Sequence, residues 1–576
     1  MPVRPSLREI GLIGVCALAT ASCERATPQP AAPALRAAAS GAVADRPRIT
    51  GGRQPALAAE PLTYPVSGPS PLASGCEGPL GGGVVYLGAE VEPSLAAHPA
   101  NPNILVGAWQ QDRWSNGSAR ALVAATSLDG GRNWTLAPLP FSRCGGGTVV
   151  NGGDYQRASD PWVTYSPNGV VHAMSLSTNG GVFQAGGTNA MLASRSFDHG
   201  RTWTHPTTLI LDGEAAFNDK NAMTADPHDA NYVYAVWDRL IAATDRGPTY
   251  FARSTNGGAS WEAARPIFDP GAANQTIGNI VAVLSNGVLL NVFNRIDSPP
   301  GGLRTSRIAV VRSLDRGQTW SQPVYIAEQF AVGTRDPVSG TAVRDGSIVP
   351  TIAAGPNGEV YVAWQDSRFT GGVHDGIALS RSSDGGLSWS TPVRVNGAPA
   401  VPAFTPSLHV AADGTVGVSY YDLRNDTATA PLSTDAWLAR SRDGGATWTD
   451  LRLGATFDLA QAPFANGLFV GDYTGLVSVG GRFLPFYARV NAGETTNRTD
   501  VVAVSLAQLP SPAPKRPTAA ARAETQSRLA PAAFLPSHAL RLRVDANLRR
   551  RLKHPPEPGA PERFMPHFAT LALLQR

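Results

Sequence analysis

The sequence has few cysteines, and none of them stands in a metal-binding motif. The four are Cys16, Cys23, Cys76 and Cys144, and the histidines are scattered without the spacing that zinc ligands need. We therefore expect neither a metal site nor another cofactor. The chain also lacks a Gly-x-Ser-x-Gly elbow and a phosphate-cradling glycine loop. These absences argue against a serine hydrolase of that type and against nucleotide binding.

Charged residues are also few. They make up 16% of the 576 residues, and the net charge is +4 at pH 7. Most of the positive excess lies in the stretch 510–576, whereas the central part of the chain carries more acidic than basic residues. An acidic body does not attract a polyanion. We therefore expect no nucleic-acid partner, and we expect the chain to act as a monomer.

The sequence lacks a hydrophobic run long enough to span a membrane. Its longest early run, from Ile10 to Ala19, is too short for a permanent transmembrane helix and follows two arginines. We interpret residues 1–22 as a signal peptide. The segment Thr20-Ala-Ser-Cys23 resembles a bacterial lipobox, which implies lipidation at Cys23 and a cell-envelope lipoprotein. The family prefers Leu where Thr20 stands, and the alternative is a periplasmic or secreted protein.

A low-complexity stretch follows the signal. Residues 23–80 are rich in Ala, Pro and Gly without a sustained apolar period, so they are interpreted as a tether. With Cys16 and Cys23 assigned to the signal, only Cys76 and Cys144 remain in the rest of the chain. In an oxidising compartment these two form a plausible disulfide, which would staple the lead-in segment to the repeat body. The alternative is two unpaired thiols.

What the chain has in excess is glycine, proline and one octapeptide. Gly 60 and Pro 48 suit short strands with many turns. The octapeptide has the pattern Ser-x-Asp-x-Gly-x-(Ser/Thr/Asn)-Trp, and Asn256 replaces the Asp in its third copy. The acidic or amide oxygen accepts backbone hydrogen bonds, the Gly allows a positive φ, and the Trp anchors the next strand. The six copies are Ser127–Trp134, Ser196–Trp203, Ser254–Trp261, Ser313–Trp320, Ser382–Trp389 and Ser441–Trp448.

This octapeptide resembles the Asp-box repeat of the sialidase superfamily. The resemblance covers about residues 81–509 and implies an all-β fold, a β-propeller of four-stranded antiparallel blades. Copies recur about every 60 to 70 residues, and a further unit after the last copy gives seven blades. Six blades, as in known sialidases, is the alternative. We expect Gly83–Gly88 to complete the last blade, and we interpret the boxes as turns of the fold without a catalytic role.

The basic segment after the repeats is expected to be a solvated tail. Residues 510–576 are rich in Pro, Ala and Arg, so both termini that flank the propeller are predicted to be disordered. Within this tail, 538–553 has the composition of a short basic helix.

Charged residues recur at the ends of the second strands. Because the start of strand one and the end of strand two share a face, arginines at these ends are expected on one rim. One interpretation is an anion site, with guanidinium forks on a substrate carboxylate. The other is that each arginine pairs with an acid of its own or a neighbouring blade. The arginines are Arg113, Arg239, Arg295, Arg368, Arg424 and Arg489, with Asp472 beside them.

The sialidase resemblance also implies catalytic residue types. That family uses a Tyr paired with a Glu as nucleophile and an Asp as the general acid/base, since a neutral nucleophile avoids repulsion by the substrate carboxylate. This sequence offers Tyr473, beside Asp472, as the Tyr, and it offers Glu92, Asp160 and Asp219 as the acids. The family's Arg-Ile-Pro stretch is missing, and Glu92-Pro-Ser stands where blade one begins.

Two functions follow from these features. The first is an exported sialidase-like glycoside hydrolase that acts on acidic glycans of the sialic- or uronic-acid type. The second is a non-catalytic β-propeller of the cell envelope that binds glycans or proteins, which the missing Arg-Ile-Pro stretch favours. In both cases the membrane is reached only through the lipid anchor, and the shared face of the blades is expected to hold the ligand.

Overall fold

The computed structural model describes residues 61–78, 82–479, 481–505, 528 and 534–552. The predicted signal peptide, Cys23, most of the tether and most of the tail lie outside these residues. The described residues belong to one compact unit, Ala59–Arg576. No helix among them has the length and apolar character of a membrane span.

The described strands form seven four-stranded antiparallel blades, as the sequence favoured. Blades one and two are joined by a single bridge between Ala119 and Ala158. Blades one to three comprise β3 (Val91–Ala97), β4 (Leu105–Trp114), β5 (Ala119–Ser127) and β6 (Thr135–Pro138); β7 (Arg157–Tyr165), β8 (Val171–Asn179), β9 (Thr188–Ser196) and β10 (Thr207–Asp212); and β11 (Ala216–Ala225), β12 (Val233–Ile241), β13 (Thr249–Ser254) and β14 (Arg265–Phe268).

The remaining blades repeat this order. Blades four to seven comprise β15 (Gln275–Val283), β16 (Leu289–Asp297), β17 (Thr305–Ser313) and β18 (Val324–Gln329); β20 (Thr351–Ala354), β21 (Val360–Asp366), β22 (Gly376–Ser382) and β23 (Val393–Arg394); β24 (Ala403–Val410), β25 (Val416–Asp422), β26 (Ser433–Ser441) and β27 (Thr449–Arg452); and β30 (Gly475–Val479), β31 (Arg482–Val490), β32 (Thr499–Ser505) and β1 (Leu62–Pro65). Short elements between them are β2 (Val85–Tyr86), β19 (Val343–Arg344), β28 (Phe457–Asp458), β29 (Leu468–Phe469) and four 3-10 turns, η1 (Arg143–Gly145), η2 (Ala242–Thr244), η3 (Arg368–Thr370) and η4 (Leu459–Gln461).

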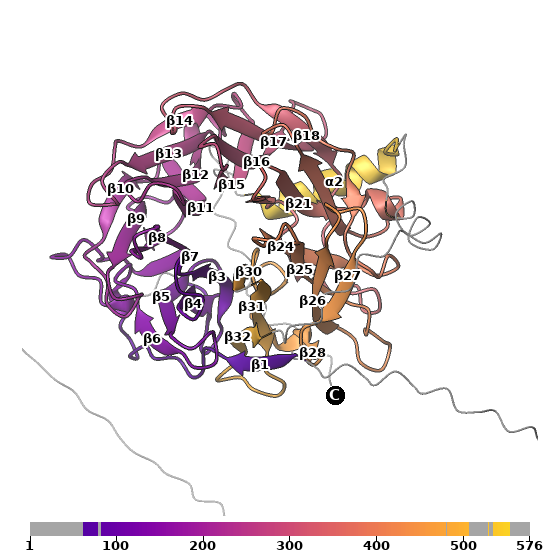
Figure 1. Cartoon of the computed structure of the whole chain (residues 1–576). Coiled ribbons are helices and arrows are strands. Elements are labelled where there is room, and N and C mark those ends of the chain that lie inside the picture. The colour runs from indigo at the N-terminus through magenta and orange to yellow at the C-terminus, as the bar shows by residue number, and fades with distance from the viewer. Residues whose placement is uncertain (1–60, 79–81, 480, 506–527, 529–533, 553–576) are drawn as a thin grey trace, which may run out of the picture. The chain divides into compact units, whose positions relative to one another are not determined.

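The blades close into a ring. The first strand of each blade contacts the first strand of the next, in the order β3, β7, β11, β15, β20, β24 and β30, and β30 contacts β3 again. Figure 1 shows these strands around a common axis, with the later strands of each blade farther out. Apolar clusters fill the spaces between neighbouring blades; one of them joins Trp109 of blade one to Phe486 of blade seven. Residues far apart in the chain therefore meet at the axis.

The strand that completes blade seven is not the predicted one. β1 pairs with β32, so that Leu62 lies opposite Ser505, whereas Gly83–Gly88 contributes only β2, which pairs with β4. Gly83 and Gly88 both have positive φ, which interrupts the extended conformation that a strand needs. At Gly88 a Cβ would lie 2.2 Å from the Thr496 carbonyl oxygen. The ring therefore begins inside the stretch that the sequence analysis interpreted as a tether.

The octapeptides form one repeated turn, as predicted. In the first copy the Ser127 hydroxyl accepts from the Gly131 amide at 2.9 Å, and Asp129 accepts from the Asn133 amide at 2.9 Å. Asn256 accepts the equivalent bond from Ser260 at 2.9 Å, so the turn needs an oxygen and not a charge. Ser127 lies opposite Leu105, at the far end of β4 from Arg113. The turns therefore lie on the face opposite the strand-one starts.

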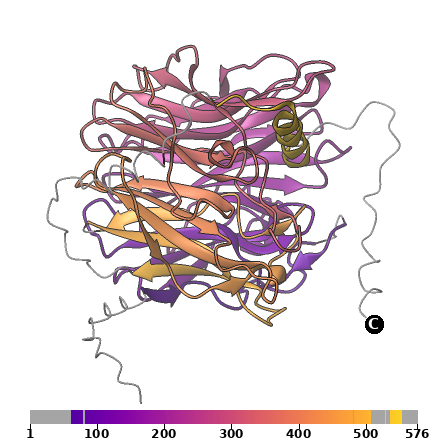
Figure 2. The same cartoon turned by 90° about the vertical axis from the view of Figure 1, so that its right-hand side faces the viewer.

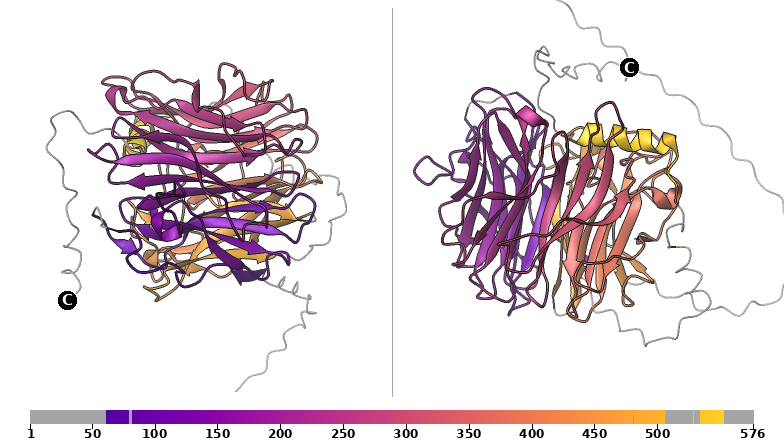
Figure 3. Two further views of the ribbon diagram at one scale, coloured as in Figure 1. Left: turned by 90° about the vertical axis from the view of Figure 1, so that its left-hand side faces the viewer. Right: turned by 90° about the horizontal axis from the view of Figure 1, so that it is seen from above.

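The tail contains a docked helix, contrary to the expectation of a solvated segment. The helix α2 (His538–Arg551) begins at Ser537, whose side chain accepts from the Leu540 amide. It lies across one face of the ring in Figure 2 and in the right-hand view of Figure 3. The reason is an apolar stripe at four-residue spacing. This stripe packs on apolar residues of blade four and of its connection to blade five, and consists of Leu540, Val544, Leu548 and Leu552.

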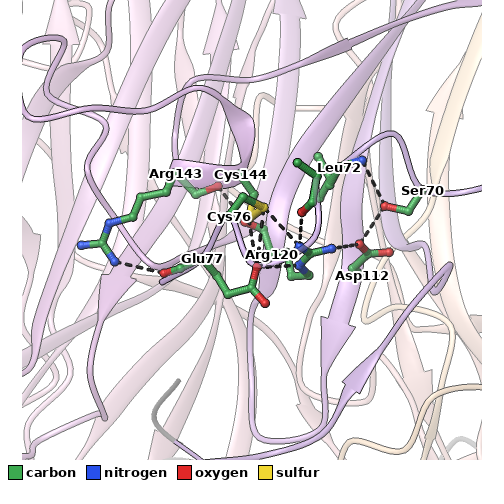
Figure 4. The surroundings of a disulfide bond; sticks show 10 residues. Ser70, Leu72, Cys76, Glu77, Asp112, Arg120, Arg143 and Cys144 are labelled. Carbon is green, nitrogen blue, oxygen red and sulfur yellow. Dashed lines mark hydrogen bonds and ion pairs between the residues drawn. A yellow bond between two sulfur atoms is a disulfide. The ribbon is translucent and has the colours of Figure 1, made fainter. Parts of the chain in front are cut away.

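Cys76 and Cys144 form the expected disulfide. It joins the segment before blade one to η1, between blades one and two. Figure 4 shows Arg120 of β5 beside it. The Arg120 guanidinium lies 2.8 Å from the Glu77 carboxylate and 2.9 Å from that of Asp112, and all three side chains are buried. The disulfide and these ion pairs together fix the lead-in segment on blade one.

Candidate functional site

The first strands carry a repeated bulge at the level where the site lies. Strand pairing slips by one residue there, as between Val91 and Ser94. A left-handed residue sits in each bulge of five blades: Glu92 (φ 55°), Asp160 (52°), Lys220 (50°), Gly278 (70°) and Thr405 (52°). Glycine takes this conformation without strain, whereas other residues incur about 1–2 kcal/mol. The three charged side chains are therefore held at the axis at a conformational cost.

These bulges bring opposite charges together on the axis. We call Glu92, Asp160, Lys220, Arg344 and Asp472 the axial cluster. The Lys220 ammonium lies 2.7 Å from Asp472, 3.2 Å from Glu92 and 3.5 Å from Asp160. Lys220 is only 8% exposed. Burial alone lowers the pKa of Lys220, but the carboxylates of Asp160, Asp472 and Glu92 outweigh it and raise the pKa well above its ordinary value.

Asp472 is the most heavily paired acid of the axial cluster. Besides Lys220, it binds Arg344 at 2.8 Å and Arg551 at 2.7 Å. Arg344 reaches it because β19 pairs in parallel with β29, just before Asp472. Burial raises the pKa of Asp472, but Arg344, Lys220 and Arg551 together hold it well below the ordinary range. Three cations from β11, β19 and α2 thus converge on one carboxylate.

One of the predicted rim arginines reaches the axial cluster. Arg113 donates to the Gln110 side chain at 2.5 Å, and Gln110 in turn donates to Glu92. Arg113 and Arg344 lie over the Phe469 ring, at 5.1 and 4.4 Å from its centroid. Burial, followed by repulsion from Arg344, lowers the pKa of Arg113 to about 10.

Four of the other rim arginines pair with acids, as the second of the two interpretations expects. Arg239 binds Asp212 of the preceding blade, whereas three arginines bind acids of their own blade, in the pairs Arg295–Asp297, Arg368–Asp366 and Arg424–Asp422. Arg489 is half-buried on β31 opposite Asp500. Charge neutralisation within and between blades accounts for these recurring Asp and Arg residues.

Only some of the predicted catalytic residues belong to the axial cluster. Glu92 and Asp160 belong to the axial cluster, whereas Asp219 is half-buried beside Lys220 and contributes to its raised pKa. The Tyr473 hydroxyl lies 3.5 Å from the Pro161 carbonyl, and its ring meets Trp162 edge-on at 5.6 Å. Burial, then Glu92, Asp160 and Asp472, raise the pKa of Tyr473 well above its ordinary value. This arrangement disfavours Tyr473 as a nucleophile.

A small cavity lies beside the axial cluster. Its volume is about 40 Å³, and Lys220, Tyr473, Asn221 and Asn279 are among its lining residues. Within the described part of the chain, Asn221 Oδ1 and Asn279 Nδ2 are buried without a protein partner. The cavity has room for a few water molecules, which these amide groups could bind.

Sequence reasoning missed three basic residues and one amide of the site. Lys220 and Gln110 lie in segments that the sequence analysis considered, but neither was given a role. Lys220-Asn221 stands in its blade where Glu92-Pro93 and Asp160-Pro161 stand in theirs. Aligning the blades would therefore have pointed to Lys220 as a site residue. Arg344 lies in the connection between blades four and five, and Arg551 lies in the tail. Nothing in the local sequence places either one at the axis.

The structure gives one grouping of metal-type ligands among its described residues. It consists of Cys76, Glu77 and Cys144, and the two sulfur atoms are joined in the disulfide.

Comparisons with known proteins give a fold likeness. No protein-family model matches the chain, and neither does any curated protein. A structure of unknown function from Dyadobacter fermentans is 17% identical with TM-score 0.42, over 73% of this chain and 94% of that chain. A Hadza microbial sialidase is 18% identical with TM-score 0.39, over 58% and 64%. The α-L-arabinofuranosidase of Fusarium graminearum is 15% identical with TM-score 0.39, over 59% and 92%. These likenesses concern the fold, and the proposed function is based on the geometry of the axial cluster.

Proposed function

We propose that the chain is an exported glycoside hydrolase whose active site is the axial cluster. The observation that supports this most is the pair of buried carboxylates Glu92 and Asp160. Each has an oxygen within 3.5 Å of the Lys220 ammonium, so these oxygens lie at most about 7 Å apart, an upper bound that overlaps the ~5–9.5 Å between paired glycosidase carboxyls. The disulfide is consistent with export, because such bonds persist in oxidising compartments.

The proposal divides the chemistry between these two acids. Asp160 serves as the general acid/base, and Glu92 serves as the second carboxylate, which attacks the sugar or activates water. Lys220 lies between them, with its ammonium 3.2 Å from Glu92 and 3.5 Å from Asp160. Strained backbone at both residues supports a functional role, since strain of this kind gathers at sites that hold side chains in place.

We propose an acidic sugar as the substrate. The support is the convergence of Lys220, Arg344 and Arg551 on the carboxylate of Asp472. Guanidinium groups recognise carboxylates through two parallel hydrogen bonds. A sugar carboxylate placed at the mouth of the axis would meet the same cations, together with Arg113.

The second function, a non-catalytic binding propeller, has an observation in its favour. Lys220 neutralises the carboxylates that would do the chemistry, and its raised pKa keeps it charged across the physiological range. In that case the axis is a docking site, and no bond is cleaved there.

Release of a fluorophore from a panel of sialyl, uronyl and neutral glycosides tests the proposal. We expect turnover of at least one acidic glycoside and none of the neutral ones. Binding of an acidic sugar without turnover favours the second function. Turnover confined to neutral glycosides would contradict the acidic-substrate proposal while retaining the enzyme.

A further inference from the structure

The helix α2 is fitted to the ring by polar contacts along its length. The Asp545 carboxylate accepts from the Arg304 amide at 2.9 Å, and Arg541 lies 2.8 Å from Glu328. The buried Asn547 amide donates to the Ala331 carbonyl and the Ser347 hydroxyl, both at 3.2 Å. Contacts of this kind at successive turns fix both the register and the orientation of a helix.

The ring surface is shaped for the helix as well. A Cβ atom at Gly333 would lie 2.5 Å from Asn547 Oδ1, and one at Gly372 would lie 2.8 Å from a Leu540 methyl group. Both glycines have positive φ. Close approach therefore depends on glycine at the two places where α2 comes nearest, which is the pattern of a permanent packing interface.

The last residue of α2 extends into the axial cluster. The Arg551 side chain is 9% exposed and lies 2.7 Å from Asp472. It also donates to the Asp345 carbonyl oxygen. Three cations face Asp472: Lys220 of β11, Arg344 of β19 and Arg551 of α2. The Asp472 backbone amide donates to Glu92 of β3 at 3.4 Å. The tail is thus one of the elements that hold this carboxylate.

We infer that α2 is a constitutive part of the axial site and that Arg551 is a positioning residue for the proposed reaction. Arg551 binds Oδ1 of Asp472 and Arg344 bridges both oxygens, which holds Oδ2 toward Lys220. Lys220 in turn sets the places of Glu92 and Asp160. The inference rests on the proposed function for its kinetic consequence only, because the ion pairs exist independently of any substrate.

The opposite role would be a lid that keeps substrate out. The contacts of the buried Asn547 and Asp545 side chains argue for a fixed element, because opening would break hydrogen bonds that contribute about 0.5–1.5 kcal/mol each and would expose the apolar stripe of α2. The two roles predict opposite changes in activity when Arg551 is removed.

The test compares Arg551→Ala and Arg551→Lys with Arg549→Ala in the full-length protein. Arg549 lies in the same last turn, is 55% exposed at its side chain and pairs with Asp545. On the acidic glycoside that the wild-type protein hydrolyses, we expect kcat to fall by about 10- to 100-fold in Arg551→Ala, as a misplaced reacting group does. We expect partial rescue in Arg551→Lys and no change in Arg549→Ala. Unchanged or higher kcat in Arg551→Ala would overturn the inference and indicate a lid.

A second readout does not depend on activity. Arg551 contributes to the low pKa of Asp472, so stability from this ion pair is present above the unfolded-state pKa and is lost as pH falls through the folded-state pKa. Removing Arg551 raises the folded-state pKa, and the midpoint of acid unfolding moves to higher pH. We expect a larger shift in Arg551→Ala than in Arg549→Ala, because Arg549 also lowers the pKa of its partner Asp545 but is mostly exposed. Equal midpoints would overturn the inference even if no glycoside proves to be a substrate.

Discussion

Replacement of Lys220 by Met is expected to lower the free energy of unfolding by about 3–5 kcal/mol at pH 7, the usual cost of removing one partner from a buried ion cluster. Lys220 has three carboxylate partners within 3.5 Å. Met has a similar length and fills the space, so the loss is one of charge. Glu92 and Asp160 then remain buried without their cation, whereas Asp472 retains Arg344 and Arg551.

The pH dependence identifies the cause. In the wild-type protein the raised pKa of Lys220 means that its contribution is fully present below the unfolded-state pKa and is lost only as pH rises through the folded-state pKa. In Lys220→Met the cluster carries an excess of negative charge, which becomes smaller as pH falls, so the loss of unfolding free energy should shrink in acid. Urea unfolding of both proteins at several pH values measures this difference.

A surface ion pair provides the control. Arg316 lies 2.8 Å from Asp229 with a half-exposed side chain, and Arg316→Met should change stability by no more than ~1 kcal/mol. If Lys220→Met is as stable as this control at pH 7, the carboxylates are not buried against Lys220 as described.

Loss of the Cys76–Cys144 disulfide is expected to cost about 4 kcal/mol, from the entropy of the loop that it closes. The bond spans a sequence separation of 68 residues. It also holds the segment that leads from β1 to blade one, and β1 completes blade seven. We therefore expect the double variant Cys76→Ser/Cys144→Ser to unfold at lower urea concentration than the wild-type protein.

Reduction supplies the matched comparison. A reductant should shift the unfolding midpoint of the wild-type protein toward that of the double variant and should leave the variant unchanged. Identical midpoints for oxidised wild-type protein and variant would mean that Arg120, Glu77 and Asp112 alone hold the lead-in segment.

The repeated turn made most of the fold predictable from sequence. Each octapeptide contains its own hydrogen-bond partners, as Ser127, Asp129 and Gly131 show. Local information therefore specifies where the third strand turns into the fourth in six blades, and the further unit after the last copy gives the seventh blade. Closure of the ring depends on pairing across the whole chain, between β1 and β32. The segment Gly83–Gly88 has suitable apolar residues, but its glycine conformations exclude it.

The tail shows a related limit. The apolar stripe of Leu540, Val544 and Leu548 is visible in the sequence, yet its four-residue spacing does not show which surface it covers. The surrounding Pro, Ala and Arg favoured a solvated segment. The groove that receives α2 is formed by residues from several separate segments, such as Ile277, Phe330 and Val349, and it exists only in the folded ring.

The acidic residues of the site could be predicted from the sequence, whereas most of its basic residues could not. Glu92, Asp160 and Asp472 stand at strand-one starts, so the order of strands places them near the axis. The arginines at strand-two ends share a face with these acids but sit farther out, where their own or the preceding blade supplies acidic partners. Lys220 and Arg551 acquire their roles from contacts across the ring and with the tail, which periodicity does not reveal.

Turnover of an acidic glycoside by Asp160→Asn and Glu92→Gln tests most directly whether the axial cluster carries out hydrolysis. These changes remove charge and retain shape. We expect at least ~100-fold lower kcat in each variant, the usual loss when an acid or base is removed, with a circular dichroism spectrum that matches the wild-type protein. Wild-type turnover in both variants would contradict hydrolysis by the axial cluster and would place the chemistry away from the axis.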